Sequence, residues 1–84
     1  MQRIKVYGAD WCSMTRRVLM RLDRLGVEYE YIDVDHDSQA SEWVKEQNDG
    51  KEKKPTLDIN GRVLTSPNNE ELDQVLRAEH LLSQ

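Results

Sequence analysis

The sequence predicts an α/β domain in which one four-stranded mixed sheet is flanked by three helices. Three patterns support this fold class: polar and apolar alternation over residues 3–7, apolar residues at helical spacing over residues 14–25, and an Asn60-Gly61 turn between two short strand-like runs. The predicted order of elements is β-α-β-α-β-β-α. The 84 residues suffice for one small domain, which we expect to span residues 1–84.

The first half of the chain predicts a strand, a helix and a second strand. Residues 3–7 form the first strand, and Gly8-Ala9-Asp10 forms a turn. Gly26 ends the following helix, because glycine readily takes the left-handed conformation of a helix C-terminus. Residues 27–34 alternate again, so we expect a second strand that is parallel to the first and partly covered on both faces. The apolar stripe of the helix comprises Met14, Val18, Leu19, Leu22 and Leu25.

The middle of the chain predicts a second helix and a hairpin. Residues 38–48 carry apolar side chains at helical spacing, and Asp37 or Ser38 can cap the start. The Asn60-Gly61 turn joins strands at residues 56–59 and 62–65, because both turn residues tolerate positive φ. These two strands are therefore antiparallel.

A third helix follows the hairpin. Asn68, with Glu71 three residues later, predicts a capping box at its start, and Ser66-Pro67 is an alternative start. The side chains expected to face inward from this helix are Leu72, Val75, Leu76 and Leu82.

Composition limits the classes of function. A formal net charge of -4 leaves no broad basic face, so we expect no nucleic-acid partner. No apolar run approaches the length of a membrane span, and the first residues lack the apolar stretch of a signal peptide, so we expect a cytoplasmic protein with no membrane partner. The single cysteine excludes an internal disulfide. The cysteine and histidine spacings do not match zinc ligands, so we expect no bound metal.

The position of Cys12 carries the strongest functional signal. This only cysteine lies between the end of the first predicted strand and the start of the first helix. Unpaired backbone N–H groups and the positive end of the helix dipole favour an anion there, so the thiolate becomes accessible near neutral pH. A lone cysteine is more often a small buried apolar residue. At this position we expect a nucleophile instead.

The chain resembles the glutaredoxin family over nearly its whole length. The resemblance rests on the strand-turn-Cys12-helix start, the Pro55 that opens the third strand, the hairpin, and the acidic start of the last helix. It implies a thioredoxin-like fold of glutaredoxin type and a thiol-disulfide oxidoreductase. It also implies no tightly bound cofactor, with glutathione or another low-molecular-weight thiol as co-substrate and protein disulfides as substrates. We expect a monomer.

The resemblance assigns Cys12 as the nucleophile, while Thr15 stands where many glutaredoxins have a second, resolving cysteine. Thr15 cannot form a disulfide, but its hydroxyl lies one helical turn after Cys12 and can donate a hydrogen bond to the thiolate. A mixed disulfide on Cys12 must then be cleared by an external thiol, which defines a monothiol mechanism.

The substrate site implied by the resemblance surrounds Cys12. Pro55 matches a proline that is cis in the family and faces the nucleophile, and Lys54 before it offers its backbone to the substrate. Trp11 is expected to line the substrate groove. At the last helix, the Glu70-Glu71 pair matches an acidic pair that holds glutathione, although the glycines that often precede it are absent here.

The first helix is rich in arginine. Arg16 and Arg17 lie close to Cys12 and are expected to supply the positive field that a lysine before the nucleophile often supplies in the family. Arg21 and Arg24 are expected to lie on a solvated helix face.

Two other functions stay open at this point. In an iron–sulfur carrier, Cys12 of two subunits and two external thiols would hold a cluster, but Ser13-Met14-Thr15 does not match the sequence of that class. In a non-catalytic adaptor, the domain would keep only a peptide-binding groove. Visible absorbance would identify the carrier, and an ordinary Cys12 pKa without turnover would identify the adaptor.

Overall fold

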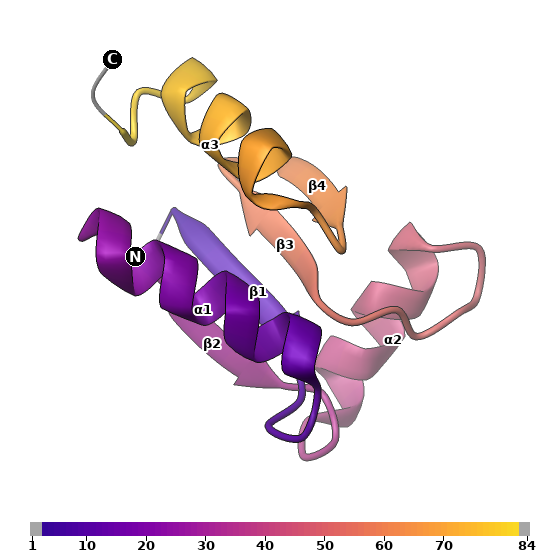
Figure 1. The fold of residues 1–84 in the computed structure, drawn as a ribbon. Helices are drawn as coiled ribbons and strands as arrows, with labels where there is room; N and C mark the ends of the chain where they lie inside the picture. Colours follow the sequence, from indigo (N-terminus) through magenta and orange to yellow (C-terminus); the bar gives the residue numbers. More distant parts are fainter. Residues whose placement is uncertain (1–2, 83–84) are drawn as a thin grey trace.

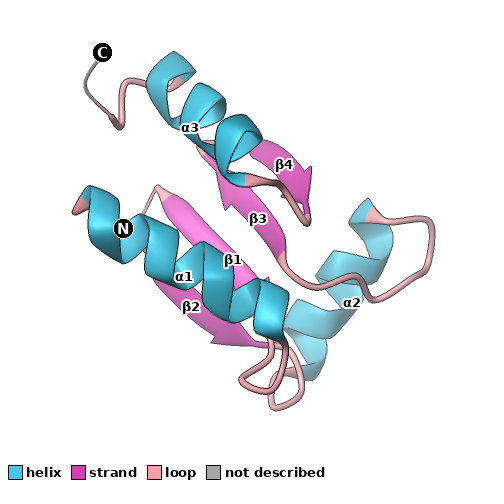
Figure 2. Ribbon diagram, in the orientation of Figure 1, coloured by secondary structure: helices cyan, strands magenta, loops and turns pink. Residues whose placement is uncertain are grey.

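The computed structural model describes residues 3–82 and has the predicted order of elements (Figure 1). The sheet has the strand order β2-β1-β3-β4. The strands β1 and β2 are parallel, whereas β3 is antiparallel to both β1 and β4 (Figure 2). The elements are β1 (Ile4–Gly8), α1 (Ser13–Leu25), β2 (Glu30–Asp33), α2 (Ser38–Gln47), β3 (Thr56–Ile59), β4 (Arg62–Thr65) and α3 (Asn69–Ala78).

Local signals set the ends of the helices. The C-cap of α1 is Gly26, at a left-handed φ of 72°. The start of α2 is capped by Asp37, whose side chain accepts a hydrogen bond from the Ala40 amide. The start of α3 has the predicted capping box between Asn68 and Glu71. The helix boundaries therefore follow from short-range chemistry.

The second strand is shorter than the predicted residues 27–34. Pairing between β1 and β2 begins with Lys5 opposite Glu30 and ends with Gly8 opposite Asp33. Residues 27–29 precede this register and lie outside β2. Alternation predicted a partly covered extended segment here, but only residues 30–33 of it pair with β1.

Two apolar clusters lie on opposite faces of the sheet. In Figure 1, α1 and α3 cover the near face and α2 lies behind it. Met14, which continues the apolar stripe of α1 in sequence, is 41% exposed and lies outside both clusters. The near cluster is built from Ile4, Val6, Val18, Leu22, Leu57, Ile59, Leu72 and Leu76, and the far cluster from Tyr7, Val34, Ala40 and Val44.

The far cluster also includes one stacked aromatic pair. Trp43 of α2 lies over Tyr7 of β1 with ring centroids 4.5 Å apart, and Trp43 is half-buried. Trp43 therefore packs against the far face of the sheet. Within residues 3–82, no helix combines the length and the apolar character needed to cross a membrane.

Candidate functional site

Cys12 is the N-cap residue of α1, in the loop that leaves β1. Its backbone is extended (φ -82°, ψ 116°), its amide donates to the Ala9 carbonyl at 3.1 Å, and its carbonyl accepts from the Arg16 amide at 3.1 Å. The side chain is partly exposed and is the free thiol of the chain. A thiol at this position faces the unpaired amides of the first helical turn. The predicted position of Cys12 between the first strand and the first helix is therefore confirmed.

The pKa of the Cys12 thiol is lower than its ordinary value. Burial has the largest effect and acts to raise this pKa. Hydrogen bonds from the Thr15 hydroxyl and from the Thr15 and Met14 amides outweigh burial, and the positive charge of Lys54 adds to them. Each of these contacts stabilises the thiolate over the thiol. The site therefore favours the reactive form of the sulfur.

Thr15 is fully buried, one turn into α1 and beside the end of β1. Its hydroxyl oxygen also accepts the Ala9 amide, at 3.4 Å. Gly8 makes this close approach possible: a Cβ at position 8 would lie 2.5 Å from both Oγ1 and Cγ2 of Thr15. Glycine at position 8 thus leaves the space on β1 that the Thr15 side chain occupies.

The predicted substrate wall contains Lys54 and the buried Pro55, joined by a cis peptide bond. Lys54 is well packed, with a side chain only 15% exposed. Its Nζ lies 4.7 Å from the centroid of the Trp11 ring, within the range of a cation–π contact. The Trp11 ring itself is 66% exposed, so it presents an open aromatic surface at the residue before Cys12.

Two carboxylates hold Lys54, and one of them, Asp35, also holds Trp11. Glu52 lies 3.0 Å and Asp35 lies 3.6 Å from Lys54 Nζ, and the Trp11 indole N–H donates to Asp35 at 2.7 Å. Burial acts to lower the pKa of Lys54, but Glu52 and Asp35 outweigh it and raise that pKa. Lys54 therefore stays charged beside Cys12.

The residues of this network come from three separate loops. Trp11 precedes α1, Asp35 follows β2, and Lys54 precedes β3. The β1–α1 and β2–α2 loops lie side by side at the lower edge of Figure 2. Sequence analysis identified Trp11 and Lys54 but missed Asp35 and Glu52. The signal that could have found Asp35 is its place directly after a parallel strand that neighbours β1.

The acidic pair at the start of α3 lies on an exposed helical turn. The Glu71 carboxylate accepts the Asn68 amide at 3.0 Å and so completes the capping box. Glu70 is exposed in the same turn. Glu71 therefore has a structural role that the family resemblance did not include.

Two arginines of α1 connect this helix to α3. Arg17 donates to the Pro67 carbonyl at 2.9 Å and to the Asn69 side chain at 3.0 Å. Arg21 contacts both carboxylate oxygens of Asp73, at 2.5 and 3.2 Å. The expectation that Arg21 is simply solvated was wrong, because Asp73 is buried on α3 and provides a partner far away in sequence.

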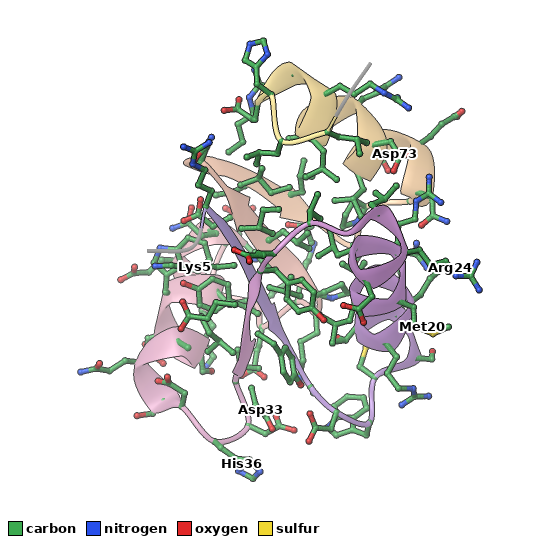
Figure 3. All side chains as sticks on the ribbon, turned by 90° about the vertical axis from the view of Figure 1, so that its left-hand side faces the viewer. Lys5, Met20, Arg24, Asp33, His36 and Asp73 are labelled. Atoms are coloured by element: carbon green, nitrogen blue, oxygen red, sulfur yellow. The ribbon has the colours of Figure 1, made fainter. Side chains whose placement is uncertain are left out.

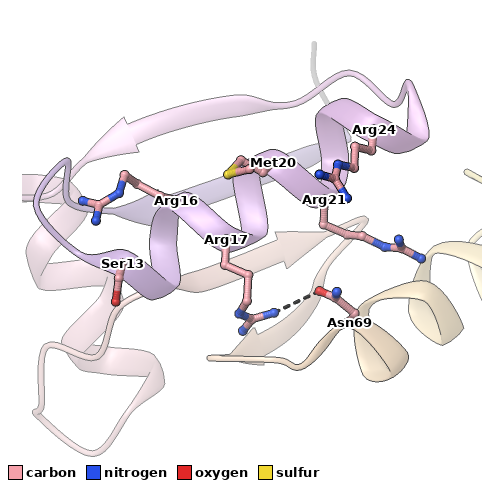
Figure 4. A pocket seen from close by; sticks show the side chains of 7 residues that line it. All are labelled: Ser13, Arg16, Arg17, Met20, Arg21, Arg24 and Asn69. Carbon is pink, nitrogen blue, oxygen red and sulfur yellow. Dashed lines mark hydrogen bonds between the residues drawn. The ribbon is translucent and has the colours of Figure 1, made fainter.

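The same face of α1 carries a groove of about 290 Å³ (Figure 4). We call it the arginine groove. Arg16 bonds to the Asp10 carbonyl at 2.9 Å and lies near the Cys12 end of the helix. The groove is lined by Arg16, Arg17, Arg21, Arg24, Met20 and Asn69, with Ser13 at its start.

The fold and the site define a class of protein: a thioredoxin-fold domain with a single activated thiol at the start of its first helix. The family model for glutaredoxin matches residues 4–64, and the chain belongs to the glutaredoxin family. Its function is accordingly a glutaredoxin-like thiol redox function with one cysteine. Among residues 3–82, no group of three or more metal-ligating side chains could hold a metal ion.

Relatives and solved structures agree with this assignment. Mycoredoxin 1 from Corynebacterium glutamicum is 47% identical over 57 residues, which are 68% of this chain and 70% of that protein. A putative glutaredoxin from Mycobacterium tuberculosis is 29% identical over 70 residues, 82% of this chain and 83% of that protein.

The solved structures include the thioredoxin-like protein BC3987, with a TM-score of 0.78 and 32% identity over 87% of this chain and 99% of that one. The glutaredoxin-like NrdH-redoxin from Escherichia coli has a TM-score of 0.77 and 19% identity, covering 88% of this chain and 95% of that one. At that identity the second structure supports the fold alone.

Proposed function

We propose that this protein reduces disulfides and mixed disulfides of low-molecular-weight thiols by a monothiol mechanism in which Cys12 is the nucleophile. The observation that carries the proposal is the lowered pKa of Cys12 at the N-cap of α1, where the Thr15 hydroxyl and the charge of Lys54 favour the thiolate. An activated thiol that is partly exposed and next to an open aromatic ring suits attack on an external disulfide.

The reaction consists of two thiol–disulfide exchanges. In the first, the Cys12 thiolate attacks one sulfur of a mixed disulfide, a new Cys12–small-thiol disulfide forms, and the substrate sulfur leaves as a thiolate that takes a proton from solvent. In the second, a free small thiol in thiolate form attacks the small-thiol sulfur on Cys12. The Cys12 thiolate leaves, and the two small thiols depart as a disulfide. Overall, each turnover consumes one free small thiol, which leaves joined to the small thiol of the mixed disulfide, and releases the substrate thiol in its reduced form.

The surrounding residues have distinct roles in this proposal. Thr15 stabilises Cys12 as attacking thiolate and as leaving group, because a lower thiol pKa improves departure. Lys54 supplies positive charge, and Trp11 together with Pro55 forms the wall along which the substrate lies. We assign Arg16 and the Glu70-Glu71 pair to contacts with charged groups of the small thiol.

Two small thiols are the first to compare as reductants. The identity to a protein named mycoredoxin favours testing mycothiol alongside glutathione. The turn before α3 reads Pro67-Asn68-Asn69 and lacks the paired glycines of many glutaredoxins, which weakens the case for glutathione. We therefore propose a low-molecular-weight thiol as reductant and leave the choice between these two to measurement.

The experiment that tests the proposal measures turnover of a peptide mixed disulfide with each thiol in parallel with Cys12 alkylation against pH. Because the chain has one cysteine, alkylation reports the Cys12 pKa without interference. We expect turnover with at least one of the two thiols and a Cys12 pKa below that of a free thiol. Dithiothreitol serves as a control reductant that does not require a binding site for a particular small thiol on the protein.

The Cys12→Ser variant is the control for the nucleophile, and its rate should fall to the uncatalysed background. A Cys12→Ser protein as active as the parent would refute the mechanism. So would an unmodified protein that shows an ordinary thiol pKa and no turnover with any reductant, since that result identifies a non-catalytic binding domain.

A further inference from the structure

The outward face of α1 concentrates positive charge on an acidic protein. The formal net charge of the chain is -4, yet four arginines line the arginine groove on one helix. Arg16, Met20 and Arg24 follow one another at intervals of four residues, so they lie on one helical face. Figure 3 shows Met20 and Arg24 on the side of α1 that points away from the sheet. The groove is thus a local feature and not a consequence of overall charge.

Most of this charge is not neutralised within the domain. Arg21 forms an ion pair with Asp73. Arg17 donates only to uncharged oxygens, those of Pro67 and Asn69, and Arg16 donates to a backbone carbonyl. In the described part of the chain, the ion pairs within 4 Å include no carboxylate partner for Arg16, Arg17 or Arg24. Three guanidinium groups therefore carry positive charge that no carboxylate in the described part of the chain compensates, and an external anion can pair with that charge.

The length of the groove discriminates between small and extended ligands. It starts at Ser13, directly after the nucleophile, and reaches Arg24. At a rise of about 1.5 Å per residue, this stretch of helix is about 16 Å long. A small thiol bound to Cys12 meets Arg16 and Arg17 at most, whereas an extended peptide of about five residues covers the whole distance.

We propose that the arginine groove docks an acidic segment of the protein whose disulfide Cys12 attacks. This inference rests on the proposed function and specifies the substrate class of the same site. Carboxylates of the segment pair with the guanidinium groups, which present fixed forks of N–H donors suited to carboxylate oxygens. Docking places a cysteine at one end of the segment next to Cys12, and the positive field accelerates encounter.

A pair of labelled peptides tests the proposal without any need for turnover. Each has one serine in the place of the reactive cysteine, followed by about four glutamates in one peptide and about four glutamines in the other. Binding to the Cys12→Ser protein is measured by fluorescence anisotropy at low salt. We expect the glutamate peptide to bind about tenfold more tightly, and the preference to disappear at about 0.5 M NaCl because these charges are exposed.

Single substitutions locate the binding. Arg16→Gln and Arg24→Gln should each weaken binding of the glutamate peptide by about threefold. The matched control is Arg3→Gln, which removes one exposed positive charge outside the groove and should leave the affinity unchanged. Equal affinity for the two peptides would overturn the proposal. An equal loss in Arg3→Gln would also overturn it, because net charge alone would then explain the preference.

Two further measurements distinguish an acidic protein segment from other possible ligands of the arginine groove. If Arg24→Gln raises the KM for the small thiol and does not change peptide affinity, the groove belongs to the small thiol and the proposal is wrong. If a short oligonucleotide of equal charge binds as tightly through the same arginines, a preference for acidic protein segments is refuted. Loss of turnover on every disulfide with intact peptide binding would refute only the proposed function.

Discussion

At the scale of single residues, the Thr15 hydroxyl helps to keep the single thiol of the chain, Cys12, in its reactive thiolate form. Thr15 occupies the place of a resolving cysteine, is fully buried, and stabilises the Cys12 thiolate. A second cysteine would remove a mixed disulfide from Cys12 within the same chain. In the mechanism that we propose, Thr15 instead makes Cys12 a better leaving group for an external thiol.

The Thr15 hydroxyl gives the first prediction. Thr15→Ala removes the hydrogen bond to the thiolate, so the pKa of Cys12 should rise and alkylation near neutral pH should slow. Thr15→Ser keeps the hydroxyl and should preserve the pKa of the parent protein. The measurement is the alkylation rate as a function of pH. A rise of equal size in both variants would attribute the effect to lost packing.

Lys54 gives a second prediction at this scale. Lys54→Gln removes a positive charge that favours the Cys12 thiolate, and the pKa of Cys12 should rise. Lys53→Gln is the matched control, since Lys53 has the same charge but an exposed position outside this network. Cys12 alkylation against pH measures both variants. Equal shifts would show that only the total charge of the loop matters.

The sequence predicts the positions of single residues around Cys12 more successfully than the contacts that join these residues. The position of Cys12 at the start of α1 follows from local order along the chain, and the cis Pro55 follows from the family resemblance; the structure has both. Asp35 was missed because its contacts with Trp11 and Lys54 exist only where three loops meet at one end of the sheet. Glu52 was missed because nothing in the sequence separates it from the other charged residues around Lys54. Polar contacts between distant segments leave no periodic signal.

At the scale of elements, the packing of α1 against α3 depends on charge as well as on apolar contact. Arg21 and Asp73 form a pair at the edge of the near cluster, and Arg17 ties α1 to the residues that begin α3. Helix bounds and caps were predictable from spacing. The pairing of Arg21 was not, because only the antiparallel hairpin before α3 brings Asp73 opposite α1.

This pair predicts how stability depends on pH. Hydrogen bonds from Arg21 are the largest reason that the pKa of Asp73 lies below its ordinary value. A depressed folded-state pKa means that the stabilisation is present above the unfolded-state pKa of about 3.9 and is lost as pH falls through the folded-state value. Asp73→Asn should therefore lower the free energy of unfolding at neutral pH, and the difference from the parent should vanish in acid.

Urea unfolding at both pH values measures this difference. Glu42→Gln, which breaks an exposed pair with Lys45 on α2, is the matched control and should change stability little at either pH. A deficit of Asp73→Asn that persisted after the carboxylate of the parent was protonated would rule out the ion pair as its cause.

At the scale of the whole molecule, the sheet separates two cores of unequal size. The near cluster under α1 and α3 contains more buried side chains than the far cluster under α2. Stability in a domain of this size depends on such packing, because the chain has no disulfide to constrain it. The binary pattern of the sequence predicted most of these positions, while Met14 shows that helical spacing alone does not guarantee burial.

The near cluster predicts a large cost for truncation. Leu22→Ala should lower the free energy of unfolding by about 2–5 kcal/mol, because it removes a fully buried side chain and leaves a cavity. Met20→Ala on the same helix removes a side chain that is 56% exposed and should change it by less than about 0.5 kcal/mol. Chemical denaturation compares the two. Similar losses would show that helix propensity and not burial governs α1.

The contact between Gly8 and Thr15 has a consequence for how the family can evolve. The two positions share one small volume, since a Cβ on residue 8 would overlap both γ atoms of Thr15. Cysteine at position 15 would have a single γ atom, but a sulfur at either γ position would still overlap a Cβ on residue 8. Exchange of threonine for cysteine at position 15 therefore leaves the demand for glycine at position 8 unchanged, and relatives with either residue at position 15 should keep glycine at position 8.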